Sequence, residues 1–228
     1  MLHQINPYNE EQFKEEFSQT DIFKQLTQDH DRILWEADMP WHRLTPRYLL
    51  ANSMFAACSF FYLKYLTELN PTTIYDIGCG ANMFKKYIPS IIGIDPDNED
   101  SRDLPGVFDS DFANNHENEF QAAYAFNSIH FVPITGINQQ VSDFIKVIKP
   151  GGRGVITINS LVVHIMTPVD VQYNMGINNF MGTFNKLIET IELPNVDILV
   201  CDFQDNGQAG NEINGDIRIV FEKSIQTS

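Results

Sequence analysis

One stretch of the sequence decides the fold: Ile74-Tyr75-Asp76-Ile77-Gly78-Cys79-Gly80-Ala81-Asn82. An apolar, β-branched run leads into an acidic residue and then into a Gly-x-Gly turn. A second apolar run, Ile91-Ile92-Gly93-Ile94, follows and ends at Asp95. A strand, a glycine turn, a short helix and a second strand with an acid at its tip are typical of the nucleotide-binding half of a doubly wound α/β sheet.

The glycines and acids of this stretch indicate the kind of ligand. Gly78 and Gly80 allow a sharp turn without a Cβ in the ligand's way, and Asp95 is placed to accept hydrogen bonds from ribose hydroxyls. Met83 stands where the dinucleotide fingerprint has its third glycine, and the carboxylate of Asp76 would repel phosphates. The pattern therefore favours an adenosine-bearing cation without phosphate.

These residues resemble the first two motifs of the class I S-adenosylmethionine-dependent methyltransferases. Further similarities follow in the family's order. Ser110-Asp111-Phe112 resembles the step after the third strand, Ala123–His130 resembles the fourth strand with its active-site tip, and Ile148–Val155, with its Pro-Gly-Gly turn, resembles the corner before the fifth strand. The resemblance covers residues 72–158. It implies an α/β fold with a doubly wound, mostly parallel seven-stranded sheet and a C-terminal antiparallel hairpin.

The resemblance also implies a cofactor and functional positions. The cofactor would be S-adenosyl-L-methionine, bound by Asp76, Gly78, Cys79, Gly80, Asp95, Pro96, Asp111, Phe112 and Asn127. In the family the acidic-then-apolar step at 111–112 holds the adenine. Asn127, at the tip of the fourth strand, is predicted to contact the ligand or the methyl acceptor.

His130 follows the same strand tip, and two interpretations of it are open. It acts as a base or orients the acceptor, or it is a partly buried loop histidine that makes one hydrogen bond. No compact set of acidic residues suggests a metal ion, so the sequence predicts no metal site.

Charge narrows the class of substrate. Thirty acidic residues against fifteen lysines and arginines give a formal charge of −15, and no basic stripe is present that would follow a phosphate backbone. Residues 127–130 also lack the Asn/Asp-Pro-Pro-Tyr motif with which the family methylates amines of DNA bases. We therefore expect a small-molecule acceptor, with a protein side chain as the alternative, and no nucleic acid.

The sequence also indicates a compartment. It has no run of about 18 apolar residues that could span a membrane, and residues 1–16 lack the pattern of a signal peptide. Three cysteines without CxxC spacing, Cys58, Cys79 and Cys201, fit a reducing compartment and argue against disulfides or a zinc site. We expect a cytoplasmic protein that does not associate with membranes.

Apolar spacing predicts two parts, a helical N-terminal extension over 1–70 and a methyltransferase domain over 71–228. Helices are expected over 12–26, 48–69, 137–148 and 171–191, and strands near 73–76, 91–94, 106–109, 122–127, 154–159, 196–201 and 216–221, with a polar loop between the last two. The short distance from Gly80 to Asp95 leaves room for one or two helical turns. The N-terminal helices are expected to cover the sheet face that this short crossover exposes.

Two other function classes stay open. The shortened helices and the acidic surface also suit a degenerate module that keeps the fold for binding S-adenosylmethionine or a protein partner. A nucleotide-dependent oxidoreductase would share the Gly-x-Gly turn, but Met83, Asp76 and the Pro-Gly-Gly corner argue against it.

Overall fold

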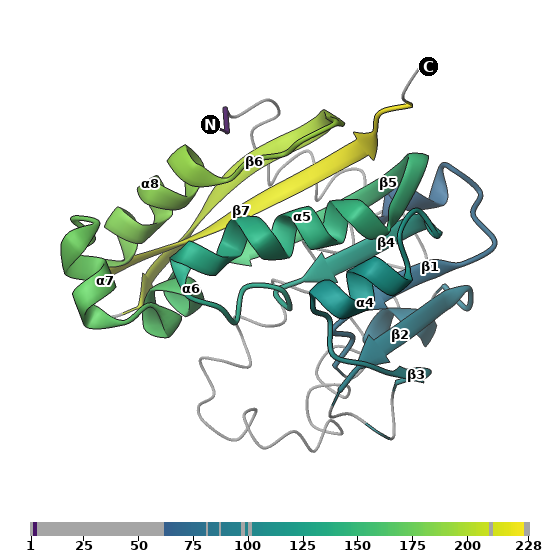
Figure 1. Cartoon of the computed structure of the whole chain (residues 1–228), viewed down its shortest axis with the longest axis horizontal. Coiled ribbons are helices and arrows are strands. Elements are labelled where there is room, and N and C mark those ends of the chain that lie inside the picture. Colours follow the sequence, from purple (N-terminus) through teal and green to yellow (C-terminus); the bar gives the residue numbers. More distant parts are fainter. Residues whose placement is uncertain are drawn as a thin grey trace.

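A seven-stranded mixed sheet in the order β3-β2-β1-β4-β5-β7-β6 forms the centre of the molecule (Figure 1). The structure, a computed structural model, describes residues 2–3, 62–80, 82–86, 88–96, 99, 102–209 and 212–225. Strands β1 to β5 are parallel, and β7 runs antiparallel between β5 and β6. The predicted doubly wound sheet with a C-terminal antiparallel hairpin is confirmed.

The elements have the following bounds. The strands are β1 (Ile74–Ile77), β2 (Ile91–Asp95), β3 (Leu104–Pro105), β4 (Phe120–Phe126), β5 (Ile148–Asn159), β6 (Val196–Ala209) and β7 (Glu212–Lys223). The helices are α4 (Ser110–Asn115), α5 (Ile137–Val147), α6 (Ser160–Met166), α7 (Val169–Asn174) and α8 (Phe180–Thr190), with 3-10 turns η2 (Met83–Lys86) and η3 (Ile134–Gly136). Residues 62–67 form a further helix. The predicted helix 12–26 and residues 48–61 of the next predicted helix lie outside the described residues.

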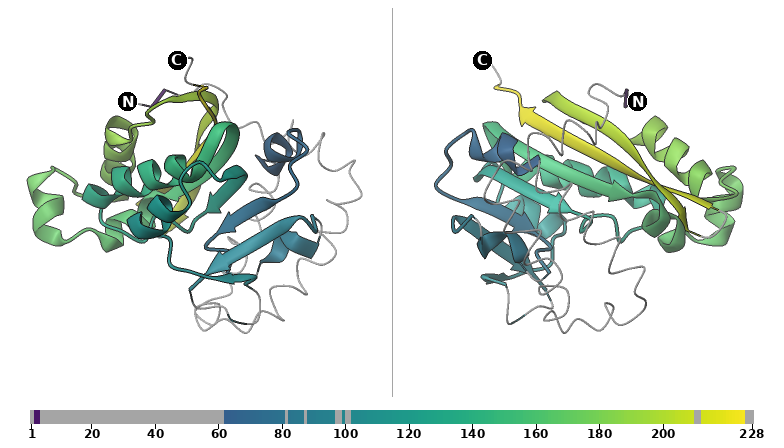
Figure 2. Two further views of the ribbon diagram at one scale, coloured as in Figure 1. Left: turned by 45° about the vertical axis from the view of Figure 1, so that its right-hand side comes forward. Right: turned by 180° about the vertical axis from the view of Figure 1, so that it is seen from behind.

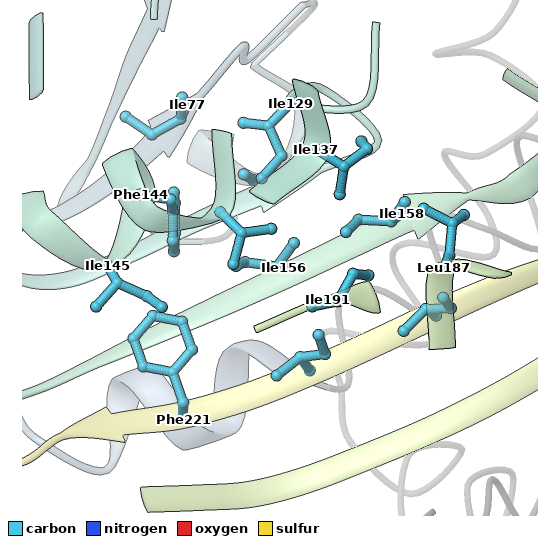
Figure 3. Packing of buried hydrophobic residues seen from close by; sticks show 14 of the residues in the cluster. Ile77, Ile129, Ile137, Phe144, Ile145, Ile156, Ile158, Leu187, Ile191 and Phe221 are labelled. Atoms are coloured by element: carbon cyan, nitrogen blue, oxygen red, sulfur yellow. The ribbon is translucent and has the colours of Figure 1, made fainter. Parts of the chain in front are cut away.

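Both faces of the sheet are buried. On one face, residues of α4, α5, α6 and α8 belong to one hydrophobic cluster with β5 and β7. Figure 3 shows Phe144 of α5, Leu187 of α8 and Phe221 of β7 within this cluster. On the other face, helix 62–67 contributes Leu63 and Leu66 to a second cluster. Figure 2 shows this helix across the sheet from α4 and α5. Helix 62–67 therefore packs on the face that the four-residue turn η2 leaves open.

A buried polar network connects helix 62–67 to the antiparallel hairpin of β6 and β7. The hydroxyl of Tyr62 donates to one carboxylate oxygen of Asp202, and Nε of Arg218 donates to the other at 2.6 Å. Asp202 and Arg218 face each other across β6 and β7, and the guanidinium carbon lies 5.5 Å from the centre of the Tyr62 ring. All three residues are buried, so the network fixes the helix against the sheet.

The predicted strand at 106–109 is wrong. The third strand is the two-residue segment Leu104–Pro105, which pairs with the end of β2. Proline has no N–H to extend such a ladder. Asp109 instead caps α4, because its side chain accepts a hydrogen bond from the backbone N–H of Phe112 at 2.9 Å. The carboxylate at 109 therefore begins a helix and does not end a strand.

The predicted single helix over 171–191 is two helices, α7 and α8. The break contains Gly176, whose φ of +69° is the left-handed conformation that ends helices. Asn179 then starts α8 by accepting the backbone N–H of Gly182 at 2.8 Å. The expected polar loop between the last two strands is also wrong, since β6 continues to Ala209 and β7 begins at Glu212.

Candidate functional site

The strand order reverses between β1 and β4, and ligands of doubly wound sheets bind outside the carboxyl ends of the strands at such a reversal. The loops that follow β1 and β4 touch there. Gly78 has a φ of +71°, and a Cβ at this position would overlap the side chain of Ser128. Ser128 in turn donates its hydroxyl to the carbonyl of Ile77. Gly78 is therefore required both by the turn and by the close approach of the β4 loop.

The glycine turn is also tied to the tip of β2. The backbone N–H groups of Gly78 and Cys79 donate to the carbonyl of Ile94 at 2.8 and 3.1 Å. The N–H of Gly80 donates to Oδ2 of Asp95 at 2.9 Å. The structure thus brings together the two parts of the predicted site, the turn after the first strand and the acid at the end of the second.

Asp76 lies beneath this turn. Its side chain is 4% exposed and accepts a hydrogen bond from the hydroxyl of Tyr124 at 2.7 Å. Burial raises the pKa of Asp76 to about 7, with the hydrogen bond from Tyr124 working in the opposite direction and the nearby charge of Asp95 adding to the rise. A cationic ligand would stabilise the ionised form of such a deeply buried carboxyl group.

Negative charge collects around Cys79. Burial raises the pKa of its thiol to about 12, and the charges of Asp76, Asp95 and Asp103 add to that rise. The thiol stays protonated at neutral pH and is no nucleophile. Asp95 and the ionised form of Asp76 favour a cation at this edge of the sheet and repel phosphate, whereas the charge of Asp103 is paired with Lys85.

The sequence does not predict Asp103 as part of the site. It accepts hydrogen bonds from the backbone N–H of Gly93 at 2.8 Å, from Nδ2 of Asn82 at 3.1 Å and from Lys85. Burial would raise its pKa, but these donors lower it. Asp103 therefore holds the segment after the glycine turn against β2.

A signal in the sequence could have pointed to this packing. Gly93 interrupts an otherwise apolar strand, and such a glycine often marks a close approach. A Cβ on Gly93 would lie 2.6 Å from Sγ of Cys79 and 2.5 Å from Nδ2 of Asn82. No periodic pattern, however, marks Asp103 itself, since it lies in the loop before β3.

Asn127 directly follows β4 and has a φ of +53°. Its backbone N–H donates to Oγ1 of Thr157 at 2.8 Å, and the same hydroxyl donates to Oδ1 of Asn127 at 3.1 Å. Thr157 belongs to β5 and is buried. One hydroxyl therefore holds both the backbone and the side chain of the predicted ligand-contacting residue.

His130 is 1% exposed, and its Nδ1 accepts the backbone N–H of Asn159 at 3.0 Å. Burial lowers the pKa of the imidazole to about 3. The ring is neutral, and the nitrogen that could take a proton already accepts a hydrogen bond. This geometry favours the interpretation of a buried histidine with one hydrogen bond over that of a base.

The other predicted site residues are Pro96, Asp111 and Phe112, which are exposed or half-buried. Pro96 is exposed beyond β2, where Arg102 donates to its carbonyl. Asp111 is exposed in the first turn of α4, and Phe112 is half-buried beside Phe108 with ring centres 5.6 Å apart. Within the part of the chain that the structure describes, no group of three His, Cys, Asp or Glu could hold a metal ion, and no helix is long and apolar enough to cross a membrane.

Comparison with known proteins relates this chain to others by structure. No protein-family model matches the sequence, and no curated protein matches it. The structure is similar to that of protein PH0226 from Pyrococcus horikoshii OT3, with a TM-score of 0.50 and 15% identity over 82% of this chain and 99% of the other. At this identity the similarity concerns the fold alone.

Two further similar structures carry functional names. An arsenic(III) S-adenosylmethionine methyltransferase from Chlamydomonas reinhardtii has a TM-score of 0.43 and 14% identity over 69% of this chain and 65% of its own. A SAM-dependent methyltransferase from Methanosarcina mazei has a TM-score of 0.42 and 15% identity over 68% of this chain and 93% of its own.

Proposed function

We propose that this chain is a cytoplasmic class I methyltransferase that transfers a methyl group from S-adenosyl-L-methionine to a small-molecule acceptor. The observation that carries the proposal is the hydrogen bond from the N–H of Gly80 to Asp95 at the carboxyl ends of β1 and β2. A glycine turn held against an acidic strand tip is the arrangement in which a doubly wound sheet binds a ribose. The buried free thiols Cys79 and Cys201 agree with a reducing compartment.

The charge of the site supports this cofactor over a dinucleotide. S-adenosylmethionine carries a sulfonium and an ammonium group and no phosphate. Asp95 and the ionised form of Asp76 place negative charge beside Cys79, which attracts these cations and repels a pyrophosphate. The same charge argues against an oxidoreductase that uses NAD.

Methyl transfer from a sulfonium requires mainly that the protein align the acceptor with the methyl carbon. When bound, the cofactor would supply a methyl group that its positively charged sulfur activates for transfer to the acceptor. The chain positions the reacting groups and excludes water. We assign Asp95 to the ribose, Asp111 and Phe112 to the adenine, and Asn127 to a hydrogen bond with the ligand.

His130 has a different assignment. Because the ring is buried and neutral, we infer that it orients the loop after β4 and takes no proton. An acceptor that attacks without losing a proton to the enzyme, such as a carboxylate or a thiolate, fits this arrangement best.

Binding of ligand fragments tests the assignments. S-adenosylhomocysteine contains the adenosine and the amino-acid cation, whereas adenosine lacks the cation. We expect Asp95→Asn to weaken the binding of both by about 1–3 kcal/mol, and Asp76→Asn to weaken only that of S-adenosylhomocysteine. The control is Asp197→Asn, which removes an exposed carboxylate on β6. Equal effects of all three variants would refute the assignments.

Turnover separates an enzyme from a binding module. The protein is incubated with S-adenosylmethionine labelled on the methyl group and with panels of carboxylate, thiol and amine acceptors. We expect label to move to at least one acceptor. Tight binding without transfer to any class would favour the degenerate module instead.

A further inference from the structure

Thr157 lies outside the predicted site but contacts it directly through Asn127. It lies in β5 directly opposite Phe126, the last residue of β4, and its side chain is 2% exposed. Its hydroxyl makes two hydrogen bonds, and both go to Asn127. Because both hydrogen bonds of this buried hydroxyl go to Asn127, they restrict the conformation of Asn127.

The direction of the two hydrogen bonds follows from the atoms involved. The backbone N–H of Asn127 can only donate, so Oγ1 of Thr157 accepts that bond at 2.8 Å. The hydroxyl has a single hydrogen, which is then available for the second bond, to Oδ1 of Asn127 at 3.1 Å. The side-chain carbonyl of Asn127 therefore faces Thr157, and its amino group is directed away from Thr157.

The backbone of Asn127 needs this support. Its φ of +53° lies in the left-handed region, which asparagine tolerates better than most residues but which still costs energy. The bond from its N–H to Thr157 holds the conformation at the point where β4 ends. Asn127 is half-buried, so part of its side chain remains accessible beyond the strand.

We propose that Thr157 is a positioning residue that fixes Asn127 as a hydrogen-bond donor, so that Asn127 recognises an oxygen or an unprotonated nitrogen of the cofactor. This inference rests on the proposed function, because it takes the ligand to be S-adenosylmethionine or its product. It goes beyond that function by naming the kind of ligand atom that the strand tip binds and the residue that sets this preference.

Titration of the full-length chain with S-adenosylhomocysteine tests the proposal. Thr157→Val removes the hydroxyl at nearly constant volume, and we expect the dissociation constant to rise about three- to tenfold. Thr157→Ser keeps the hydroxyl and should bind within about twofold of the natural protein. A merely structural role would not give this rescue by serine, because serine loses the methyl contacts that valine keeps.

Thr183→Val is the matched control. Thr183 is also a buried threonine, and its hydroxyl contacts Nδ1 of His164 at 2.7 Å, within the α6–α8 region. We expect this variant to lower thermal stability and to leave the dissociation constant within about twofold of the natural protein. An equal loss of affinity in both valine variants would overturn the proposal.

A second substitution tests the donor assignment without altering Thr157. Asn127→Asp keeps an oxygen that can accept the Thr157 hydroxyl but replaces the amino group by an acceptor. We expect affinity for S-adenosylhomocysteine to fall about tenfold or more. Unchanged or tighter binding would overturn the donor assignment. If the natural protein itself does not bind S-adenosylhomocysteine, the proposed function fails and this inference fails with it.

Discussion

Asp76 combines a buried position with a carboxyl group whose pKa is about 7, against 3.8 for the ordinary side chain. The folded state therefore holds this proton more tightly than the unfolded chain does. The contribution of Asp76 to stability is complete below about pH 4 and is lost as the pH rises towards 7. At neutral pH the folded protein keeps an acid that a more stable sequence would avoid, which is expected at a binding site.

Asp76→Asn should therefore stabilise the protein at high pH. Asparagine can still accept the hydroxyl of Tyr124 but does not titrate. Relative to the natural protein, we expect the unfolding free energy of the variant to rise by about 2–3 kcal/mol between pH 5 and pH 8. Urea denaturation at a series of pH values measures this difference. A difference that does not change with pH would mean that Asp76 is ionised throughout this range.

Gly78 offers a second test at the scale of single residues. An alanine at position 78 would have to adopt a φ of +71°, and its Cβ would overlap the side chain of Ser128. An alanine at position 176 would have to adopt a similar φ of +69°, but nothing lies within 4 Å of its Cβ. We expect Gly176→Ala to cost about 1–2 kcal/mol from the backbone alone. Gly78→Ala should cost more and should also weaken the binding of S-adenosylhomocysteine. Equal costs in thermal denaturation would contradict the close approach of the two loops.

Among the elements, helix 62–67 covers a part of the sheet that the short crossover from β1 to β2 leaves open. The crossover from β1 to β2 contains only the four-residue turn η2, too short to cover the sheet. Leu63 and Leu66 of the helix pack on that face together with Phe84 of η2. Helix 62–67 is thus part of the core, and its attachment through Tyr62 contributes to the stability of the sheet.

We expect Tyr62→Phe to destabilise the protein by about 1–3 kcal/mol, because it leaves an oxygen of the buried Asp202 carboxylate without the Tyr62 donor. Tyr173→Phe, at a position 82% exposed on α7, is the control and should change stability by less than about 0.5 kcal/mol. Denaturation in urea compares the two. Equal stability of both variants would show that the Tyr62 hydroxyl does not anchor the helix.

At the scale of the whole molecule, the net charge determines which large charged ligands can bind. A charge of −15 repels a phosphate backbone. We predict no binding of duplex DNA or RNA at low salt, where electrostatic attraction would be strongest. A gel-shift assay at about 50 mM salt measures this. Retention that weakens as salt is added would contradict the expectation that the substrate is not a nucleic acid.

The sequence predicted the parts of the fold that repeat or follow a motif. Apolar runs frame the turn at Gly78–Gly80 and the strand ending at Asp95, so the sequence predicts both. The third strand escapes this pattern, because Leu104–Pro105 is too short to show a period of two. The helix break at Gly176 escapes it as well, because apolar spacing continues across the break.

Contacts between distant residues could not be predicted in this way. Thr157 lies thirty positions from Asn127 in the sequence, and Asp103 lies ten from Gly93. Only the pairing of the strands brings these residues together, and neither stands in a recognisable motif. The burial of His130 likewise depends on its contact with Asn159 at the end of β5, so a strand-tip position alone could not decide whether it was a base.

Isothermal titration of the full-length protein with S-adenosylhomocysteine, with NAD as a parallel control, tests the central claim most directly. A site that combines Asp76, Asp95 and the Gly78–Gly80 turn should bind S-adenosylhomocysteine with a dissociation constant on the order of micromolar. It should give no heat with NAD, because the carboxylates of Asp76 and Asp95 repel the pyrophosphate. Binding of NAD in preference to S-adenosylhomocysteine, or of neither, would contradict the claim that this chain uses S-adenosylmethionine.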